Sequence, residues 1–317
     1  MRFMHKEHDV HMAKVSPATL EFEEGKTMVA FKKILFPTDF SANADKALAH
    51  AIRLADFDGG EVIAQHVVGN YFEKHPHWAT LFDLHELQKY MDGYVDAHMT
   101  KMLPLDTRNV HVRSVISKGK PAEEIAALAE REFVDLVVMG SAKGVVTNNV
   151  IRMTNRPVLA VSATQPSCNE VGLHKVTKIL VATDFSQHSK RVVQYAFDLK
   201  RIFDAAIYML YVIETSHAID WAFRQGHFTH AIDKMREWAG NQLVNLTPDD
   251  FLKDPTVIRL VETGSPGDII ANVAFEVGAD LTILGTHEYG TIHKHLIGST
   301  TDKLLTKTST PILTVKL

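Results

Sequence analysis

Short apolar runs alternate along the chain with longer segments in which apolar residues recur at helical spacing. The runs lie at residues 34–37, 62–68, 110–116 and 158–161 and again at 179–182, 207–213, 256–261 and 312–315, and two more end at Gly140 and Gly285. Apolar runs of this length, bounded by turn residues, are typical of strands buried on both faces of a parallel sheet. The pattern therefore predicts α/β domains, each a doubly wound five-stranded parallel sheet with helices on both faces.

The sequence contains one internal repeat. Residues 33–41 recur at 178–186, residues 119–121 at 264–266 and residues 135–140 at 280–285, all at an offset of 145. Residues 156–161 match 310–315 at an offset of 154, so the first copy is nine residues shorter before its last strand. Two copies of this length predict tandem domains at 31–163 and 177–317. A linker rich in Ser, Pro and Asn at 164–176 joins them, and an extension at 1–30 precedes them.

Composition and charge exclude several classes of protein. The 317 residues are 45% hydrophobic and 23% charged, close to the average of globular proteins and unlike disordered or collagen-like chains. A formal net charge of −4 provides no basic surface for nucleic acid or an anionic membrane. The sequence has no apolar stretch long enough to cross a membrane and no apolar signal-peptide segment. We therefore expect a soluble cytoplasmic protein without membrane insertion.

Cysteine and histidine give little support to redox or metal chemistry. Cys168 is the single cysteine, so neither an intrachain disulfide nor a two-cysteine site can form. His5, His8 and His11 would share one helix face if this segment is helical, but no acidic or cysteine residue fixes a metal site with them. We predict no metal site and interpret the extension as a solvated tail, with a His-based pH or metal sensor as the weaker alternative and Met28 as a second candidate start. The aromatic and methionine residues that follow the second strand of each copy are expected to pack in the core: Trp78, Phe82, Met91, Trp221, Phe228 and Trp238.

The residues that can carry binding chemistry follow strands. Asp39 and Asp184 end the first strand of each copy, at the edge where open α/β sheets bind ligands. Each carboxylate could accept hydrogen bonds from ribose hydroxyls or close an Asx turn. In the second copy, Gly285 and Gly298 frame a loop that leads into a helix beginning near Ser299. Backbone N–H groups and hydroxyls at such a helix start favour phosphate, although the loop lacks the Gly-Lys-Ser or Gly-Lys-Thr of a Walker loop.

Together these motifs resemble the universal stress protein family over residues 31–317. The matching features are Thr-Asp-Phe-Ser after the first strand, Gly-x-Pro at a helix start, Ala-Asp-Leu before the fourth strand, and the Gly-rich loop with Gly-Ser before the last helix. The resemblance implies ATP, with or without Mg²⁺, in the second copy, with Asp184 on the ribose, Val212 beside adenine and Gly298, Ser299 and Thr300 on phosphate. The implied nucleotide-binding set is Ala182, Thr183, Asp184, Val212, Leu284, Gly285, Thr286, His287, Gly298, Ser299, Thr300 and Thr301.

Both copies depart from the family pattern. Glu288 stands at the second Gly of the loop and brings a Cβ and a negative charge towards the phosphates, which Gly290, His293, Lys294 and His295 could partly offset. In the first copy Gly144 takes the place of Gly298, but Val145 and Val146 replace Ser299 and Thr300. We therefore predict that the first site is degenerate for a triphosphate and that this copy is mainly structural. The residues of the degenerate site are Thr38, Asp39, Val67 and Gly140.

Two functional hypotheses follow. Neither copy offers a nucleophile with an adjacent base, a metal cluster or a carboxylate pair, so we predict no catalytic residues and at most slow ATP hydrolysis. The first hypothesis is a stress-response regulatory protein that binds ATP or a related adenine nucleotide in the second copy. The alternative is a nucleotide-free scaffold, with no cofactor, for a protein partner or a transporter. The resemblance also implies self-association through the last strands, 158–161 with 312–315, which would make the chain an intrachain pseudo-dimer. The sequence does not identify the protein partner.

Overall fold

The computed structural model describes residues 29–69, 83–102, 109–141, 145–162, 176–215, 225, 229–286 and 299–316. The first half comprises β1 (Lys33–Thr38), α1 (Ala42–Asp58), β2 (Glu61–Val68), α4 (Leu84–Met102), β3 (His111–Lys118), α5 (Pro121–Arg131), β4 (Leu136–Ser141), α6 (Val145–Met153) and β5 (Val158–Ser162). The second half comprises β6 (Lys178–Ala182), α7 (Gln187–Phe203), β7 (Ala206–Glu214), α9 (Thr229–Asn245), the 3₁₀ turn η1 (Asp249–Phe251), β8 (Val257–Gly264), α10 (Pro266–Val277), β9 (Leu281–Thr286), α11 (Ser299–Lys307) and β10 (Ile312–Lys316).

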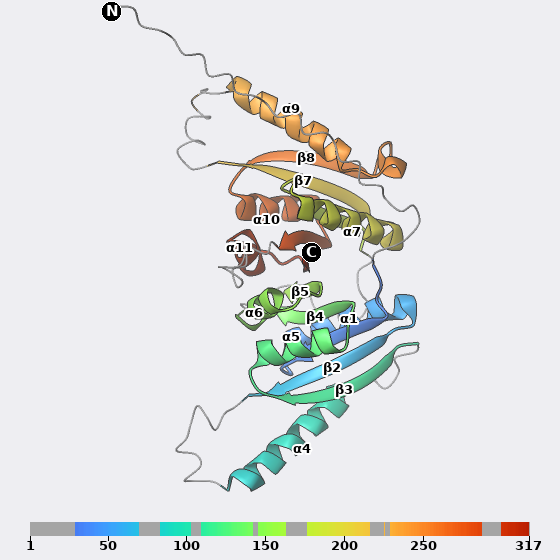
Figure 1. Cartoon of the computed structure of the whole chain (residues 1–317), viewed down its shortest axis with the longest axis vertical. Coiled ribbons are helices and arrows are strands. Elements are labelled where there is room, and N and C mark those ends of the chain that lie inside the picture. Colours follow the sequence, from blue (N-terminus) through green and yellow to red (C-terminus); the bar gives the residue numbers. More distant parts are fainter. Residues whose placement is uncertain are drawn as a thin grey trace, which may run out of the picture.

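The described strands form one ten-stranded sheet in the order β3-β2-β1-β4-β5-β10-β9-β6-β7-β8. Within each half the strand pairs are parallel, and the two halves join where β5 and β10 pair antiparallel. The molecule is elongated, with this junction at its middle and α4 and α9 towards opposite ends (Figure 1). The predicted fold class, two doubly wound five-stranded domains that form an intrachain pseudo-dimer, is confirmed.

Local sequence signals fix where four of the helices begin. Ser41 and Ser186 cap α1 and α7, and each side chain accepts a hydrogen bond from the backbone three residues on. Pro121 and Pro266 open α5 and α10, where a missing N–H costs nothing. The Gly-x-Pro motif needs its glycine because Gly119 has φ of 149° and the equivalent glycine of the second half 144°, which side chains rarely adopt.

The third strand of each half is longer than its apolar run. β3 reaches Lys118 and β8 reaches Gly264, whereas the apolar pattern predicted ends at 116 and 261. The ladder with β2 continues through Ser117 and Lys118, which pair with Val67 and Val68. These strands lie at the ends of the sheet order, where exposed polar residues can follow the ladder, so the hydrophobic pattern underestimates their length.

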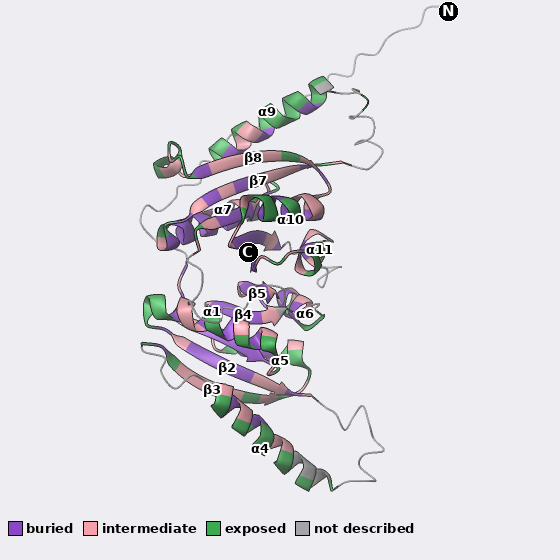
Figure 2. Cartoon of the chain, turned by 180° about the vertical axis from the view of Figure 1, so that it is seen from behind, coloured by how far each residue is buried: buried purple, intermediate pink, exposed green. Residues whose placement is uncertain are grey.

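Alternate strand residues face two different cores. Ile34 and Phe36 of β1 belong to a cluster that continues through α1 and α7 into the second half. Leu35, between them, belongs to a cluster under α5 and α6, and its counterpart Leu180 to a cluster under α10 and α11. The buried strands form a continuous band through both halves (Figure 2). One core is therefore shared by the halves on one face, and each half has its own on the other.

The two halves contact each other through several elements. Leu313 pairs in register with Leu159 across the β5–β10 junction, as the resemblance predicted for the last strands. Asn148 of α6 donates from Nδ2 to Asp302 Oδ1 of α11 at 3.1 Å. Lys316 Nζ donates to the carbonyl of Arg152 at 3.0 Å. These polar contacts align α6 and α11 across the junction.

Of the residues predicted to pack in the core, Met91 and Trp238 are described. Met91 packs against the shared core. Trp238 is 49% exposed, so it lies at the rim of the core rather than inside it. Several features singled out in the sequence lie outside the described residues: the His5, His8 and His11 triplet, Met28, Trp78, Phe82, Gly144, Cys168, Trp221, Phe228, His287, Glu288, Gly290, His293, Lys294, His295 and Gly298.

Candidate nucleotide site

The Thr-Asp-Phe-Ser turn has the same geometry in both halves. Phe40 and Phe185 both take φ of 61°, in the left-handed region. In the second half, Thr183 Oγ1 accepts from the Phe185 N–H at 3.2 Å and Asp184 Oδ1 accepts from the Ser186 N–H at 3.0 Å. The first half repeats both bonds, at 3.0 Å each. These hydrogen bonds hold the turn and stabilise the left-handed residue within it.

This turn explains where the two candidate carboxylates lie. Asp39 and Asp184 close an Asx turn, which was one of the two roles left open from sequence. Each of these residues is also exposed at the carboxyl end of its strand. Because a carboxylate can accept several hydrogen bonds, the Asx turn leaves capacity for ligand hydroxyls. The turn geometry alone therefore does not distinguish the halves.

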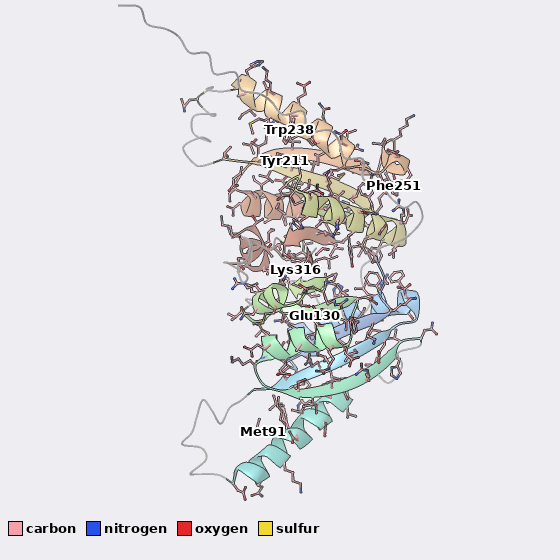
Figure 3. The ribbon with its side chains drawn as sticks, viewed as in Figure 1. Met91, Glu130, Tyr211, Trp238, Phe251 and Lys316 are labelled. Atoms are coloured by element: carbon pink, nitrogen blue, oxygen red, sulfur yellow. The ribbon has the colours of Figure 1, made fainter. Side chains whose placement is uncertain are left out.

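An aromatic stack covers each turn. Phe185 stacks on Tyr211 of β7 with ring centroids 4.4 Å apart, and Trp238 packs perpendicular to Phe185 with ring centroids 5.4 Å apart. The labelled side chains of Tyr211 and Trp238 lie together in this part of the second half (Figure 3). Burial and the negative charge of Asp184 raise the pKa of the Tyr211 hydroxyl. In the first half His66 takes the place of Tyr211 and stacks on Phe40 at 4.5 Å.

The sheet brings together the strand ends predicted for the second site. β6 pairs with β7 on one side and with β9 on the other, so Ala182, Val212 and the Leu284–Thr286 stretch lie on three adjacent strands. Thr183 is buried and donates from Oγ1 to Ser189 Oγ at 2.9 Å, so its hydroxyl supports the turn. Thr300 and the buried Thr301 lie in the first turn of α11. His287 and Gly298 lie outside the described residues, as does the side chain of Ser299.

Thr286 is a position at which the second half differs from the first. Thr286 ends β9, where the Gly-rich loop begins, and its Oγ1 is buried without a hydrogen-bond partner among the described residues. In the first half Ser141 ends β4 at the equivalent place. A buried hydroxyl without a partner costs free energy, so this position favours an additional polar contact with the loop or with a ligand.

The four residues predicted for the first site line one cavity of about 330 Å³. Thr38 and Asp39 contribute from β1 and its turn, Val67 from β2 and Gly140 from β4. Val145 and Val146, at the start of α6, complete the rim. Sequence reasoning missed other residues of this cavity, among them Gln65, whose only signal is a polar residue inside the apolar run of β2.

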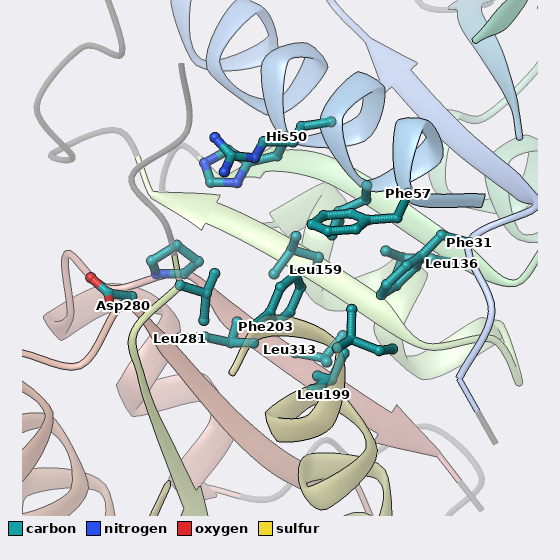
Figure 4. Close-up of a pocket in the computed structure, with 15 residues that line it drawn as sticks. Phe31, His50, Phe57, Leu136, Leu159, Leu199, Phe203, Asp280, Leu281 and Leu313 are labelled. Atoms are coloured by element: carbon teal, nitrogen blue, oxygen red, sulfur yellow. The ribbon is translucent and has the colours of Figure 1, made fainter. Parts of the chain in front are cut away.

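A second cavity, of about 270 Å³, lies between the halves over the β5–β10 junction (Figure 4). Phe57 of α1 and Phe203 of α7 meet edge to face with centroids 5.5 Å apart. Leu159 and Leu313, paired across the junction, form its floor, with Leu136 and Leu281 beside them. The lining is mainly apolar, so this cavity belongs to the contact between halves.

Within the described residues, no group of three or more His, Cys, Asp or Glu side chains could hold a metal ion. In that same part of the chain, no helix is both long enough and apolar enough to cross a membrane.

The family model of the universal stress proteins matches the chain twice, at residues 30–162 and 175–316. The chain belongs to the universal stress protein family. Each match covers one set of five strands, so this universal stress protein has a tandem arrangement of two family domains.

The chain is similar to individual universal stress proteins. Universal stress protein MJ0577 of Methanocaldococcus jannaschii is 33% identical over 155 residues, covering 42% of this chain and 96% of the relative. The crystal structure of a universal stress protein from Archaeoglobus fulgidus superposes with a TM-score of 0.62 at 19% identity, covering 90% of this chain and 96% of that one, which shows the same fold. Another solved member, a universal stress protein in complex with cAMP, is 22% identical with a TM-score of 0.32, covering 45% of this chain and 98% of that one.

Proposed function

We propose that this chain is a cytoplasmic stress-response regulatory protein that binds ATP, or a related adenine nucleotide, in its second half. The first half lacks the triphosphate site and mainly supports the second. The domains would be residues 31–163 and 177–317, joined by the linker at 164–176. The observation that carries the proposal is the meeting of three features at the carboxyl edge of the sheet: the exposed Asp184, the Oγ1 of Thr286, which has no hydrogen-bond partner within the described part of the chain, and the N-terminus of α11.

Each feature suits one part of an adenine nucleotide. Asp184 would accept hydrogen bonds from ribose hydroxyls, and Val212 on the neighbouring strand would contact the adenine ring. The first turn of α11 would bind phosphate through its backbone N–H groups and the hydroxyls of Ser299 and Thr300, because a helix N-terminus attracts anions. Mg²⁺, if it accompanies ATP, would be bound mainly through the phosphates.

The first half differs at the position that would meet the phosphates. Val145 and Val146 occupy the first turn of α6, and Val145 is 75% exposed. Valine offers no hydroxyl to a phosphate, whereas the equivalent residues of α11 are Ser299 and Thr300. This difference supports nucleotide binding by the second half alone.

A regulatory rather than catalytic role follows from the residues present at the site. Among the residues that the structure describes, Asp184 and Thr286 are not accompanied by a nucleophile with an adjacent base, so we expect at most slow hydrolysis. At nucleotide concentrations well above Kd, bound nucleotide would raise the free energy of unfolding in proportion to the logarithm of the nucleotide concentration. ATP would thereby change the order of the loop or its contacts with a partner, and the chain would act as a sensor.

The test compares two matched carboxylates by titrating ATP into the full-length chain. Asp184→Asn should weaken binding by about 10- to 100-fold, because a charged acceptor is replaced by a neutral one. Asp39→Asn, which changes the same turn in the first half, should leave ATP affinity unchanged. No binding at millimolar ATP would contradict the proposal and leave the nucleotide-free scaffold, which rests on the charge that Glu288 brings to the loop.

A further inference from the structure

In the first half, one carboxylate ties α5 to the turn between α6 and β5. Glu130, labelled in Figure 3, accepts at Oε1 from Thr154 Oγ1 at 2.9 Å and from the Asn155 N–H at 2.7 Å. Its Oε2 accepts from Arg156 Nε at 3.2 Å. Burial alone would raise the pKa of this carboxyl, but the three hydrogen bonds and the charge of Arg156 hold it below its ordinary value. This turn therefore binds an ionised carboxylate.

The second half repeats the turn between α11 and β10 without the carboxylate. Residues 308–310 correspond to 154–156 at the repeat offset of 154. Thr308 Oγ1 accepts from the backbone N–H two residues on at 3.0 Å, and the equivalent bond of the first half has the same length. Among the described residues, however, no group accepts from the Thr308 hydroxyl or from the Ser309 N–H. The donors that hold a carboxylate in the first half are present here without one.

Three side chains that lie on or beside the turn in the first half are replaced in the second. At equivalent positions of the repeat, Glu130 becomes Phe275, Phe133 becomes Gly278 and Arg156 becomes Thr310. An open pocket of about 660 Å³ lies at this place, lined by α10 and the turn before β10. Every residue of its lining belongs to the described ranges 229–286 and 299–316. The turn that Glu130 covers in the first half is therefore accessible in the second.

The charges beside this pocket suit one carboxylate. Lys307, which stands where the first half has Met153, lines the pocket and pairs with Asp268. Lys303 Nζ lies 3.9 Å from Asp268 Oδ2, so two lysines share one aspartate. The second half therefore has a cation beside its turn, although it lacks the arginine of the first half.

The shape of the pocket indicates the kind of molecule that carries the carboxylate. Phe275 is 84% exposed at its edge. Sites for small molecules enclose most of the ligand, whereas exposed aromatic rings beside polar groups are typical of protein interfaces. An open site with an exposed ring therefore favours a segment of polypeptide.

We propose that this pocket is the docking site for an acidic segment of a partner protein. A glutamate side chain of the partner takes the place that Glu130 takes in the first half, and its carboxylate accepts from the Thr308 hydroxyl and the Ser309 N–H. An apolar side chain next to this glutamate packs on the ring of Phe275. The first half does not dock such a segment, because Glu130 occupies its turn. The pocket contains none of the residues proposed to bind ATP, so the two proposals are independent.

The probe is a pair of capped peptides, Ac-Ala-Leu-Glu-Leu-Ala-NH₂ and the same peptide with Gln in place of Glu, titrated into the isotope-labelled full-length chain. In nuclear magnetic resonance spectra, the Glu peptide should move the Ser309 amide proton downfield, because a charge-assisted hydrogen bond forms. The Asn155 amide already donates to Glu130 and should not move. The Gln peptide should bind about 10-fold more weakly or less tightly still. Equal binding of the two peptides, or an unmoved Ser309 amide at millimolar Glu peptide, would overturn the inference.

Phe275→Glu should close the pocket from within the chain. Its carboxylate can reach the Thr308 hydroxyl and the Ser309 N–H as Glu130 reaches its own turn, so this variant should lose the Glu peptide and melt at a higher temperature than wild type. Phe275→Gln is the matched control, and it should bind the Glu peptide about 10-fold more tightly than Phe275→Glu does. Both variants should fold, because position 275 is exposed. Unchanged peptide affinity in Phe275→Glu would contradict the assignment of the site.

Two further measurements distinguish other occupants. Sedimentation velocity should give the same molecular mass for wild type and Phe275→Glu, and a dimer that is lost in the variant would show that a second copy, not another protein, occupies the pocket. Inorganic phosphate at the concentration of the peptide should leave the Ser309 amide in place. An equal shift with phosphate would indicate a general anion site and overturn the docking of a peptide. Titration of ATP reports on the proposed function separately.

Discussion

Gly140 and Gly285 occupy the same position of the repeat, yet their surroundings differ. A Cβ at Gly140 would lie 2.7 Å from the backbone carbon and oxygen of Asn43. At Gly285 the nearest atom would be a side-chain methyl of Val192 at 3.1 Å. Moving backbone atoms aside costs much free energy, whereas a side chain can shift by a few tenths of an ångström at little cost. The first glycine is therefore required by the close approach of β4 to α1.

This difference predicts unequal costs for the same substitution. Gly140→Ala should lower the free energy of unfolding by about 2–3 kcal/mol, as overpacking of a rigid site does, and Gly285→Ala by less than about 1 kcal/mol. Urea denaturation of the two variants beside the wild type measures both values. Equal losses would show that the backbone around Gly140 adapts more readily than its contacts indicate.

The residue scale also shows what sequence could and could not predict about the sites. Asp39 and Asp184 were predictable because a polar residue directly after a buried strand reaches the ligand edge of an α/β sheet. Gln65 was not, because its partners Ser117 and Glu124 are 52 and 59 residues away and the unpaired oxygen becomes visible only in three dimensions. The rim position of Trp238 was missed for a related reason, since helical spacing does not show how far a face is covered.

At the scale of elements, the end of α7 depends on one buried cation. Lys200 Nζ donates to the Ala205 carbonyl at 2.9 Å and to Thr256 Oγ1 at 2.7 Å, and lies 3.1 Å from Asp254 Oδ2. Hydrogen bonds from the Thr256 hydroxyl and N–H, followed by the charge of Lys200, lower the pKa of Asp254 to about 2. This carboxylate connects α7 to the turn that leads into β8.

The lowered pKa predicts a change of stability with pH. Asp254 binds protons less readily in the folded chain than in the unfolded chain, so its contribution is complete above about pH 4 and is lost as the pH falls towards 2. Asp254→Asn should lower the free energy of unfolding at pH 7 by on the order of 1 kcal/mol and flatten its pH dependence between 4 and 2. Urea denaturation between pH 4 and pH 7 and between pH 2 and pH 4 measures this free energy for wild type and variant, and Asp249→Asn, at an exposed residue, is the control. Parallel pH curves for wild type and Asp254→Asn would contradict the assignment.

The type of element was predictable where the apolar residues follow either a strand pattern or a helical spacing throughout the segment. Buried strands such as β1 and β6 and capped helices such as α1 and α7 follow directly from apolar runs and from Ser41 and Ser186. The ends of β3 were not, because Ser117 and Lys118 are held by ladder hydrogen bonds to β2 and carry no apolar signal. Pairing partners distant in sequence decided those boundaries.

At the scale of the whole molecule, the two halves share a sheet and a core. Leu313 and Leu159 are buried where β10 pairs with β5, and Leu313 belongs to the core cluster that spans both halves. A substitution that destabilises the junction should therefore destabilise both halves. The shared sheet and core therefore predict that the chain unfolds as one cooperative body and not as two independent domains joined by a linker.

The junction can be tested by creating a cavity in it. Leu313→Ala should lower the free energy of unfolding by about 2–5 kcal/mol, since a buried leucine is truncated beside an existing cavity. Hydrogen exchange followed by mass spectrometry should show lowered protection in β1 and β4 as well as in β6 and β9. Lowered protection confined to β6–β10 would indicate that the halves unfold separately.

The central claim is that one half of this tandem universal stress protein binds ATP and the other does not. Equilibrium dialysis of radiolabelled ATP against the full-length chain measures the number of sites directly. We expect one ATP per chain, and we expect Gly298→Asp to abolish its binding, because the added carboxylate would block close approach of the phosphates. Two sites per chain, or none at millimolar ATP, would contradict it.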